Sequence, residues 1–175
     1  MSDMERFLAE VERRAFKTAM VATGNREDAL DIVQDAMVKM VQKYQDRPRA
    51  EWGPLFNSIL QSRIMDWHRR TKVRSVVRSF FSKDDDDQQD EEANVPGREA
   101  DNPVDQLSNS HTMNALEEAI HQLPIRQQQA FMLRIWEGYD VAETAKVMGC
   151  SQGSVKTHLS RATQRLREVL GDHWP

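Results

Sequence analysis

The sequence predicts an all-α fold of two small helical domains joined by an acidic flexible linker. Apolar residues recur at three- and four-residue spacing through most of the chain, which is the period of an amphipathic helix. Alternation of polar and apolar residues never persists long enough to indicate a strand. One stretch near the middle has almost no large apolar residues, so it cannot bury enough surface to offset the entropy cost of ordering. The 175 residues allow one medium domain or two small ones, and the acidic stretch favours two.

The first domain is expected at residues 1–75 and begins with two helices. Apolar spacing predicts the first helix, and Gly24 is a suitable C-terminal stop for it. Asn25 can cap a second helix, which is expected to run to about Tyr44. The apolar stripe of this second helix consists of Leu30, Val33, Met37, Met40, Val41 and Tyr44.

A loop and a third helix are expected to complete this domain. Pro48 and the Gly53-Pro54 pair predict a break in the chain, because both residue types interrupt helices. The third helix is then expected at about residues 55–72. Residues 76–108 follow as the linker, and repulsion between like charges should keep it extended.

The second domain is expected at residues 109–175. Its apolar spacing predicts helices at about residues 113–123, 127–136, 141–148 and 152–170. The stop signals are Pro124, Gly138 and Gly149, and Ser151 is suited to cap the last helix.

The overall charge hides two basic segments. The formal net charge is −4 at pH 7, and residues 84–101 alone carry −8, with nine acids and one base. The rest of the chain therefore carries +4. Positive charge gathers at residues 63–83, with a net charge of +6, and at residues 146–170, with +4. Such clusters indicate nucleic-acid binding, and the acidic run Asp84–Asp87 is expected to repel DNA.

Composition argues against several classes of protein. The one cysteine, Cys150, excludes an internal disulfide framework and a multi-cysteine zinc site, so neither metal nor cofactor is expected. We expect Cys150 to be a buried turn residue, with a redox sensor as the alternative.

The sequence has no phosphate-cradling glycine loop and no nucleophile with a plausible base, so an enzyme is not expected. No apolar run approaches the roughly 20 residues that span a bilayer, and the N-terminus lacks a signal-peptide core. The chain is therefore expected to be cytoplasmic, without membrane insertion.

Residues 140–162, DVAETAKVMGCSQGSVKTHLSRA, carry the strongest functional signal. A helix of about eight residues, a turn beginning with glycine and a basic amphipathic helix form the pattern of a helix-turn-helix. In that motif the second helix projects polar side chains into the major groove. Lys156, Thr157, Ser160 and Arg161 lie off the apolar stripe and are candidates for DNA contact. An ordinary helical hairpin with a solvated basic face is the alternative.

Three stretches of the chain match a known pattern in order and spacing. They are LPIRQQQAFMLRIWEGYDVAETAKVMGCSQGSVKTHLSRATQRLRE, GNREDALDIVQDAMVKMVQKY and the segment 55–70, which contains ILQSRIMDWHRR. The first resembles region 4 of RNA polymerase sigma factors of the extracytoplasmic-function (ECF) group. The second resembles region 2.2 of the same group, and the third resembles the end of region 2, which meets the melted promoter.

This resemblance implies a sigma factor that binds core RNA polymerase and directs promoter-specific transcription initiation. The implied partners are the β-prime clamp helices and β flap of core polymerase, promoter DNA and an anti-sigma protein. The second helix would bind the clamp helices, with polar contacts from Asp31, Gln34 and Asp35. A solvated helix face is the alternative for these three residues.

The resemblance also implies two separate DNA-binding surfaces. The residues assigned to the upstream, minus-thirty-five element are Ser151, Ser154, Lys156, Thr157, His158, Ser160 and Arg161. Those assigned to the minus-ten element are Gln61, Ser62, Arg63, Asp66, Trp67, Arg69 and Arg70. Trp52, Phe56 and Trp67 are candidate stacking platforms for unpaired bases. Core packing is the favoured interpretation for Trp52 and Phe56, and both roles are open for Trp67.

A helix-turn-helix regulator that binds double-stranded operators without polymerase is a second possible class. The acidic and apolar second helix favours the sigma factor, and so does a basic segment separate from the recognition helix. Binding of promoter DNA by the purified chain alone, or only with core polymerase, distinguishes the two classes.

Overall fold

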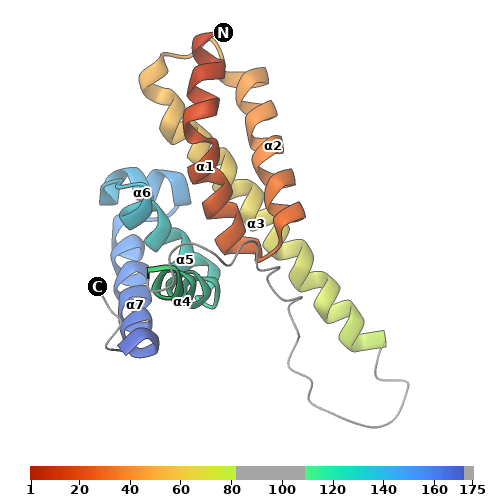
Figure 1. The fold of residues 1–175 in the computed structure, drawn as a ribbon, viewed down its shortest axis with the longest axis vertical. Helices are drawn as coiled ribbons and strands as arrows, with labels where there is room; N and C mark the ends of the chain where they lie inside the picture. The colour runs from red at the N-terminus through yellow and green to blue at the C-terminus, as the bar shows by residue number, and fades with distance from the viewer. Residues whose placement is uncertain (82–108, 172–175) are drawn as a thin grey trace.

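The computed structural model describes residues 1–81 and 109–171. Every regular element within these two ranges is a helix, which confirms the predicted all-α fold. The elements are α1 (Asp3–Thr23), α2 (Arg26–Tyr44), α3 (Arg49–Phe81), α4 (Asn109–His121), α5 (Ile125–Phe131), the π-helix η2 (Met132–Trp136), α6 (Val141–Met148) and α7 (Gln152–Leu170). Figure 1 shows α1 to α3 as one bundle, here the N-terminal unit, and α4 to α7 as a second, the C-terminal unit.

Local capping signals set the boundary between α1 and α2. Gly24 ends α1 with a φ of 65°, and its N–H donates to the Met20 carbonyl oxygen (2.8 Å). Glycine adopts this left-handed conformation without steric cost. The Asn25 side chain accepts a hydrogen bond from the Asp28 N–H (3.0 Å) at the start of α2. The predicted stop and cap are therefore confirmed.

Replacing Asn25 by alanine should lower the free energy of unfolding by about 1 kcal/mol. The change removes the side-chain oxygen that accepts a hydrogen bond from the Asp28 N–H at the N-terminus of α2. Asn25→Asp keeps an acceptor at the same place and should retain most of the stability. Urea denaturation followed by circular dichroism measures both variants, and equal losses would contradict the capping role.

The core of the N-terminal unit forms where α3 packs on α1 and α2. Phe56, Leu60 and Ile64 are at most 2% exposed and follow one another at four-residue spacing on α3. Phe7 of α1 packs against the rings of Trp52 and Phe56, with centroid distances of 5.6 and 6.1 Å. Trp52 is only 5% exposed. Trp52 and Phe56 are thus core residues, and the stacking role considered for them is wrong.

The predicted break at the Gly53-Pro54 pair is also wrong, because α3 begins at Arg49 and runs through both residues. Pro54 has no N–H to bond to the carbonyl oxygen one turn earlier, so the helix forgoes one hydrogen bond there. The buried rings of Trp52 and Phe56 lie on either side of the pair and hold this turn against the core. Tertiary packing outweighs the local preference.

α3 is longer than predicted at its other end as well, since it continues past Lys72 to Phe81. The segment 73–81 contains neither glycine nor proline and keeps apolar residues at helical spacing. Its last two side chains face solvent, with Phe80 and Phe81 73% and 81% exposed. The helix therefore enters the predicted linker. The remainder of that linker, with its acidic run, lies outside the described residues.

The core of the C-terminal unit consists of two apolar clusters that share α7. One cluster joins α4 to α7 and the other joins α6 to α7, while α5 and η2 contribute to both. The fully buried side chains are Leu133, Val155, Ala162 and Leu166, among others. α6 and α7 have the limits that the sequence predicts.

The predicted helix at residues 127–136 begins slightly earlier, at Ile125, and ends as a π-helical turn. The Glu137 N–H donates to the Met132 carbonyl oxygen five residues earlier (2.9 Å). Gly138 follows with a φ of 74°, as its predicted role as a stop requires.

The two units pack directly against each other. α1 contacts α4, and α3 contacts both α5 and α6. Val21 of α1 is buried in the core of the C-terminal unit, and Ile125 of α5 packs on the core of the N-terminal unit. This association lies beyond what helical periodicity predicts.

Candidate nucleic-acid interface

The helix-turn-helix forms from α6, a short turn and α7, and each end is capped locally. The Asp140 side chain accepts a hydrogen bond from the Glu143 N–H (2.7 Å) at the start of α6. Gly149 ends α6 with a φ of 65°. The Ser151 hydroxyl then accepts from the Ser154 N–H (3.1 Å) and begins α7. The predicted helix-turn-helix geometry is present.

Arg126 of α5 braces the turn of this motif. Its guanidinium donates to the Met148 carbonyl oxygen and to Gln129 Oε1, both at 2.9 Å. The first bond satisfies one of the carbonyl groups that the end of α6 leaves without a helical partner. Arg126 thereby ties α5 to the turn that sets the angle between α6 and α7.

The outer face of α7 is polar and accessible. Of the residues predicted to contact the minus-thirty-five element, Ser151, Lys156, Thr157, Ser160 and Arg161 are exposed, and Ser154 and His158 are half-buried. The Thr157 hydroxyl donates to the Gly153 carbonyl oxygen (3.0 Å), so its proton is already used within the helix. Phosphate oxygens need donors, so Lys156 and Arg161 are the residues best suited to phosphate or base contact.

His158 lies beside this face in a neutral form at pH 7. Burial lowers its pKa below the ordinary value, and the nearby charges of Arg126 and Arg161 lower it further. A neutral imidazole offers one donor and one acceptor nitrogen. His158 therefore adds hydrogen-bonding capacity to the face of α7 without adding charge.

The residues predicted for the minus-ten element follow one another along the middle of α3, but their accessibility differs. Ser62, Arg69 and Arg70 are exposed, and Arg63, Asp66 and Trp67 are half-buried. Gln61 is only 3% exposed, so it is closed to solvent in this arrangement. The His68 pKa is lowered by burial and by the charge of Lys72, so its ring is also neutral near pH 7.

Trp67 is held by the N-terminal unit. Its indole N–H donates to the Asp28 carboxylate (Nε1···Oδ2 2.9 Å), and its ring packs against the core. The Trp67 side chain is nonetheless half-buried rather than buried, so part of its surface is accessible to solvent. Between the two roles predicted for it, the structure gives Trp67 a packing role, and base stacking stays a prediction.

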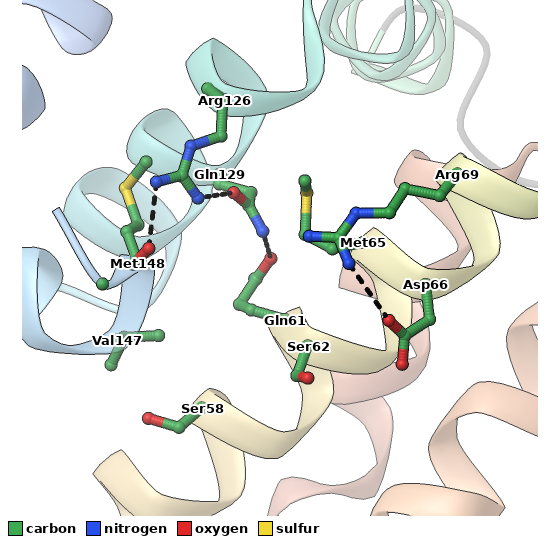
Figure 2. Close-up of a pocket in the computed structure, with 11 residues that line it drawn as sticks. Ser58, Gln61, Ser62, Met65, Asp66, Arg69, Arg126, Gln129, Val147 and Met148 are labelled. Carbon is green, nitrogen blue, oxygen red and sulfur yellow. Dashed lines mark hydrogen bonds and ion pairs between the residues drawn. The ribbon is translucent and has the colours of Figure 1, made fainter. Parts of the chain in front are cut away.

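A cleft of about 240 Å³ lies between α3 of the N-terminal unit and α5, α6 and the helix-turn-helix turn of the C-terminal unit. Figure 2 shows its two walls, with α3 on one side and the end of α6 on the other. We call it the inter-unit cleft. The residues that line it are Ser58, Gln61, Ser62, Met65, Asp66, Arg69, Arg126, Gln129, Val147, Met148 and Gly149. Four of these belong to the minus-ten set. Sequence reasoning missed the cleft, because no local signal reports contact between distant helices.

α2 presents the residues predicted to bind polymerase. Asp31, Gln34 and Asp35 are all exposed. Exposed apolar side chains lie among them, with Leu30 39% and Val38 54% exposed. A helix face that mixes acids with exposed apolar residues is suited to binding another protein. Gln34 also lines a groove of about 440 Å³ between α1 and α2.

The described ranges were searched for other kinds of site. No group of three or more His, Cys, Asp or Glu side chains in residues 1–81 and 109–171 is placed to hold a metal ion. No helix in the same ranges is long and apolar enough to span a membrane. Cys150 is a free, half-buried thiol in the helix-turn-helix turn, and so is less buried than predicted.

Comparison with known proteins shows which proteins this chain resembles. The family model described as "Sigma-70, region 4" matches residues 113–166, which contain the helix-turn-helix. The ECF RNA polymerase sigma factor SigM of Mycobacterium tuberculosis H37Rv is 26% identical over 164 residues, covering 91% of this chain and 72% of SigM. The chain is similar to ECF sigma factors over most of its length. The part that matches region 4 lies in the C-terminal unit described above.

Two further proteins are similar to this chain. The ECF sigma factor BldN of Streptomyces coelicolor is 28% identical to this chain over 154 residues, covering 85% of this chain and 53% of BldN. The sigma factor RpoE of Bartonella quintana, solved in complex with the anti-sigma factor NepR, superposes with a TM-score of 0.63. That match has 23% identity and covers 97% of this chain and 98% of RpoE, so the fold is shared over nearly its whole length.

Proposed function

We propose that this sigma factor recruits core RNA polymerase through α2, binds the minus-thirty-five element as duplex through α7, and acts on the minus-ten element through α3. Directing promoter-specific transcription initiation is the function of the ECF sigma factors that it resembles. The observation that supports the assignment of α7 to duplex DNA is its polar face. Lys156 and Arg161 are exposed there, while Val155, Ala162 and Leu166 of the same helix are buried in the core.

The proposed domains follow from the same division. Residues 1–75 act on polymerase and the minus-ten element, residues 76–108 join the domains, and residues 109–175 bind the minus-thirty-five element. The basic segment of α3 is distinct from the recognition helix, which an operator-binding regulator would not require. The sigma factor relatives also disfavour that alternative.

The proposed partners are core polymerase, promoter DNA and an anti-sigma protein. Within polymerase, α2 would bind the β-prime clamp helices and the C-terminal unit would bind the β flap. The relative RpoE was solved with the anti-sigma factor NepR, which supports a partner of that class here. The protein acts by binding and not by catalysis, in the cytoplasm where bacterial polymerase works.

Reconstitution tests the proposal. The purified chain, added to core polymerase, should produce transcripts that begin at discrete sites on genomic DNA, and sequencing their 5′ ends identifies the promoters. The chain without polymerase should protect no discrete site from cleavage, and core polymerase without the chain should initiate at none. Site-specific protection by the chain alone, with no discrete transcripts in the reconstituted reaction, would instead establish an operator-binding regulator.

A further inference from the structure

The end of α3 lies outside the apolar cores of both units. Every residue from Arg69 to Phe81 is exposed, and none belongs to an apolar cluster of the described chain. Figure 1 shows this end of the helix, in yellow-green, extending beyond the rest of the N-terminal unit. We call residues 69–81 the projecting end of α3. It can reach an external partner without any rearrangement of the two units.

Apolar side chains gather along one side of the projecting end. Four of them have the spacing i, i+3, i+4 and i+7, which places them in one stripe of a helix, and a fifth borders the stripe. These residues are Val73, Val76, Val77, Phe80 and Phe81, with exposed fractions of 61, 50, 45, 73 and 81%. A contiguous exposed apolar patch of this kind marks an interaction site.

Positive charge accompanies the apolar stripe. The bases of the projecting end are Arg69, Arg70, Lys72, Arg74 and Arg78, and no acid occurs between Asp66 and Asp84. Ser75 and Ser79 lie on the side of the helix away from the stripe, because each residue turns the helix by about 100°. The projecting end is therefore a basic amphipathic helix whose apolar face meets solvent.

This combination favours an anionic lipid surface as the partner. A helix that lies on a bilayer inserts its apolar side chains into the boundary between headgroups and acyl chains, and its bases contact the headgroups. A cluster of about four to eight bases on an amphipathic helix is typical of binding to anionic lipid. The five bases and five apolar residues of the projecting end match both requirements.

Two other partners fit the stripe less well. Valine has no π-face on which an unpaired base can stack, and an apolar stripe offers no hydrogen bond to a base edge. A second copy of the chain would bring two basic helices together. A stable dimer interface also takes about 20–30 residues on each side, which is more than the projecting end contains.

We propose that the projecting end of α3 binds the surface of an anionic phospholipid bilayer, with Phe80 and Phe81 in the acyl boundary and the bases against headgroup phosphates. Binding is peripheral, since no helix in the described ranges is long and apolar enough to cross a membrane. The inference rests on the proposed function in one respect. Arg69 and Arg70 belong to the minus-ten set, so membrane and promoter would compete for them.

The charge balance makes this binding dependent on salt. The acidic run Asp84–Asp87, which lies outside the described residues, follows soon after Phe81 in the sequence and opposes contact with anionic headgroups. Raising the ionic strength well above about 0.1 M should weaken binding, because salt screens the attraction of the bases. Replacing Asp84–Asp87 by asparagine should strengthen it several-fold.

Vesicle flotation tests the proposal with the full chain and no polymerase. The probes are vesicles of phosphatidylcholine alone and of phosphatidylcholine with an equal amount of phosphatidylglycerol. We expect at least about tenfold stronger partitioning into the anionic vesicles. Phe80→Ser/Phe81→Ser should lower that partitioning at least about tenfold, because two rings no longer leave water. The matched control is Ile135→Ser/Val169→Ser, which replaces two apolar residues that are 60% and 65% exposed elsewhere, and it should bind as the wild type does.

A second measurement tests the orientation of the helix. Cys150 is the chain's one cysteine, so Cys150→Ser permits labelling at a single new site. The fluorophore NBD, attached at Val77→Cys on the stripe, should shift its emission to the blue and brighten with anionic vesicles. The same label at Ser75→Cys, on the opposite side, should respond much less.

Several results would overturn the proposal. Equal binding to the two kinds of vesicle removes the anionic lipid, and undiminished binding by the phenylalanine variant removes the stripe. Equal NBD responses at the two positions contradict the orientation. The stripe is instead a dimer contact if sedimentation shows a dimer that the phenylalanine variant dissociates while no vesicle binding occurs. It is a nucleic-acid contact if that variant loses affinity for labelled oligodeoxythymidine and keeps its vesicle binding.

Reconstituted transcription separates failure of this inference from failure of the proposed function. Anionic vesicles should inhibit initiation by polymerase with the wild-type chain more than with Phe80→Ser/Phe81→Ser. If the chain binds no vesicles but still produces discrete transcripts, the inference alone fails. If the chain binds anionic vesicles but produces no discrete transcripts with polymerase, the proposed function alone fails.

Discussion

Arg161→Ala should lose discrimination at the upstream element, while Arg69→Ala/Arg70→Ala should slow strand separation and leave upstream preference unchanged. Arg161 is exposed on α7 and free to enter a major groove. A bidentate arginine–guanine contact supplies about 1–3 kcal/mol, so preference between upstream sequences should fall roughly 5- to 150-fold. Arg69 and Arg70 are exposed on α3, where Arg69 forms only a loose ion pair with Asp66 (3.6 Å).

In vitro transcription combined with permanganate footprinting of unpaired thymines measures both effects. Promoters are altered in one element at a time, so each variant is tested against each element. Arg165→Ala is the matched control on α7, because Arg165 is exposed but outside the predicted contact set. The assignment of two surfaces fails if Arg161→Ala alters preference at the downstream element. It fails equally if the double variant melts DNA at the wild-type rate.

Reversing charge at Asp31 and Asp35 should weaken association with core polymerase by at least about tenfold, or about 1.4 kcal/mol. Both carboxylates are exposed on α2, beside the exposed apolar side chains of Leu30 and Val38. Lysine at both positions would oppose a partner surface that is complementary to acids. Equilibrium titration of labelled core polymerase with Asp31→Lys/Asp35→Lys measures the loss.

The matched control is Asp46→Lys/Glu168→Lys, which reverses two exposed acids outside α2. Circular dichroism should show equal helicity in both variants, because all four positions face solvent. If both double variants lose affinity equally, the effect is one of net charge and α2 is not the specific contact. Wild-type affinity in the α2 variant would remove Asp31 and Asp35 from the polymerase site.

Helix ends were predictable wherever a cap is encoded within a few residues. Gly24 and Asn25 separate α1 from α2, and Gly149 and Ser151 separate α6 from α7, at the predicted positions. Such caps depend on a side chain and a backbone group three or four residues apart. The break expected at Pro54 failed for the opposite reason, because burial of neighbouring rings by a different helix overrode the local preference.

The candidate sites divide in the same way. Exposure of Lys156 and Arg161 follows from the period of one helix, since the apolar stripe must face the core and the remaining positions face water. Burial of Gln61 follows from Gln129, a residue 68 positions away in sequence. No helical period encodes a contact over that separation, because it depends on how two completed bundles pack. Local sequence therefore determines which basic side chains each proposed DNA surface presents, whereas the burial of Gln61 by Gln129 is decided only by the tertiary structure, because it depends on residues far apart in the chain.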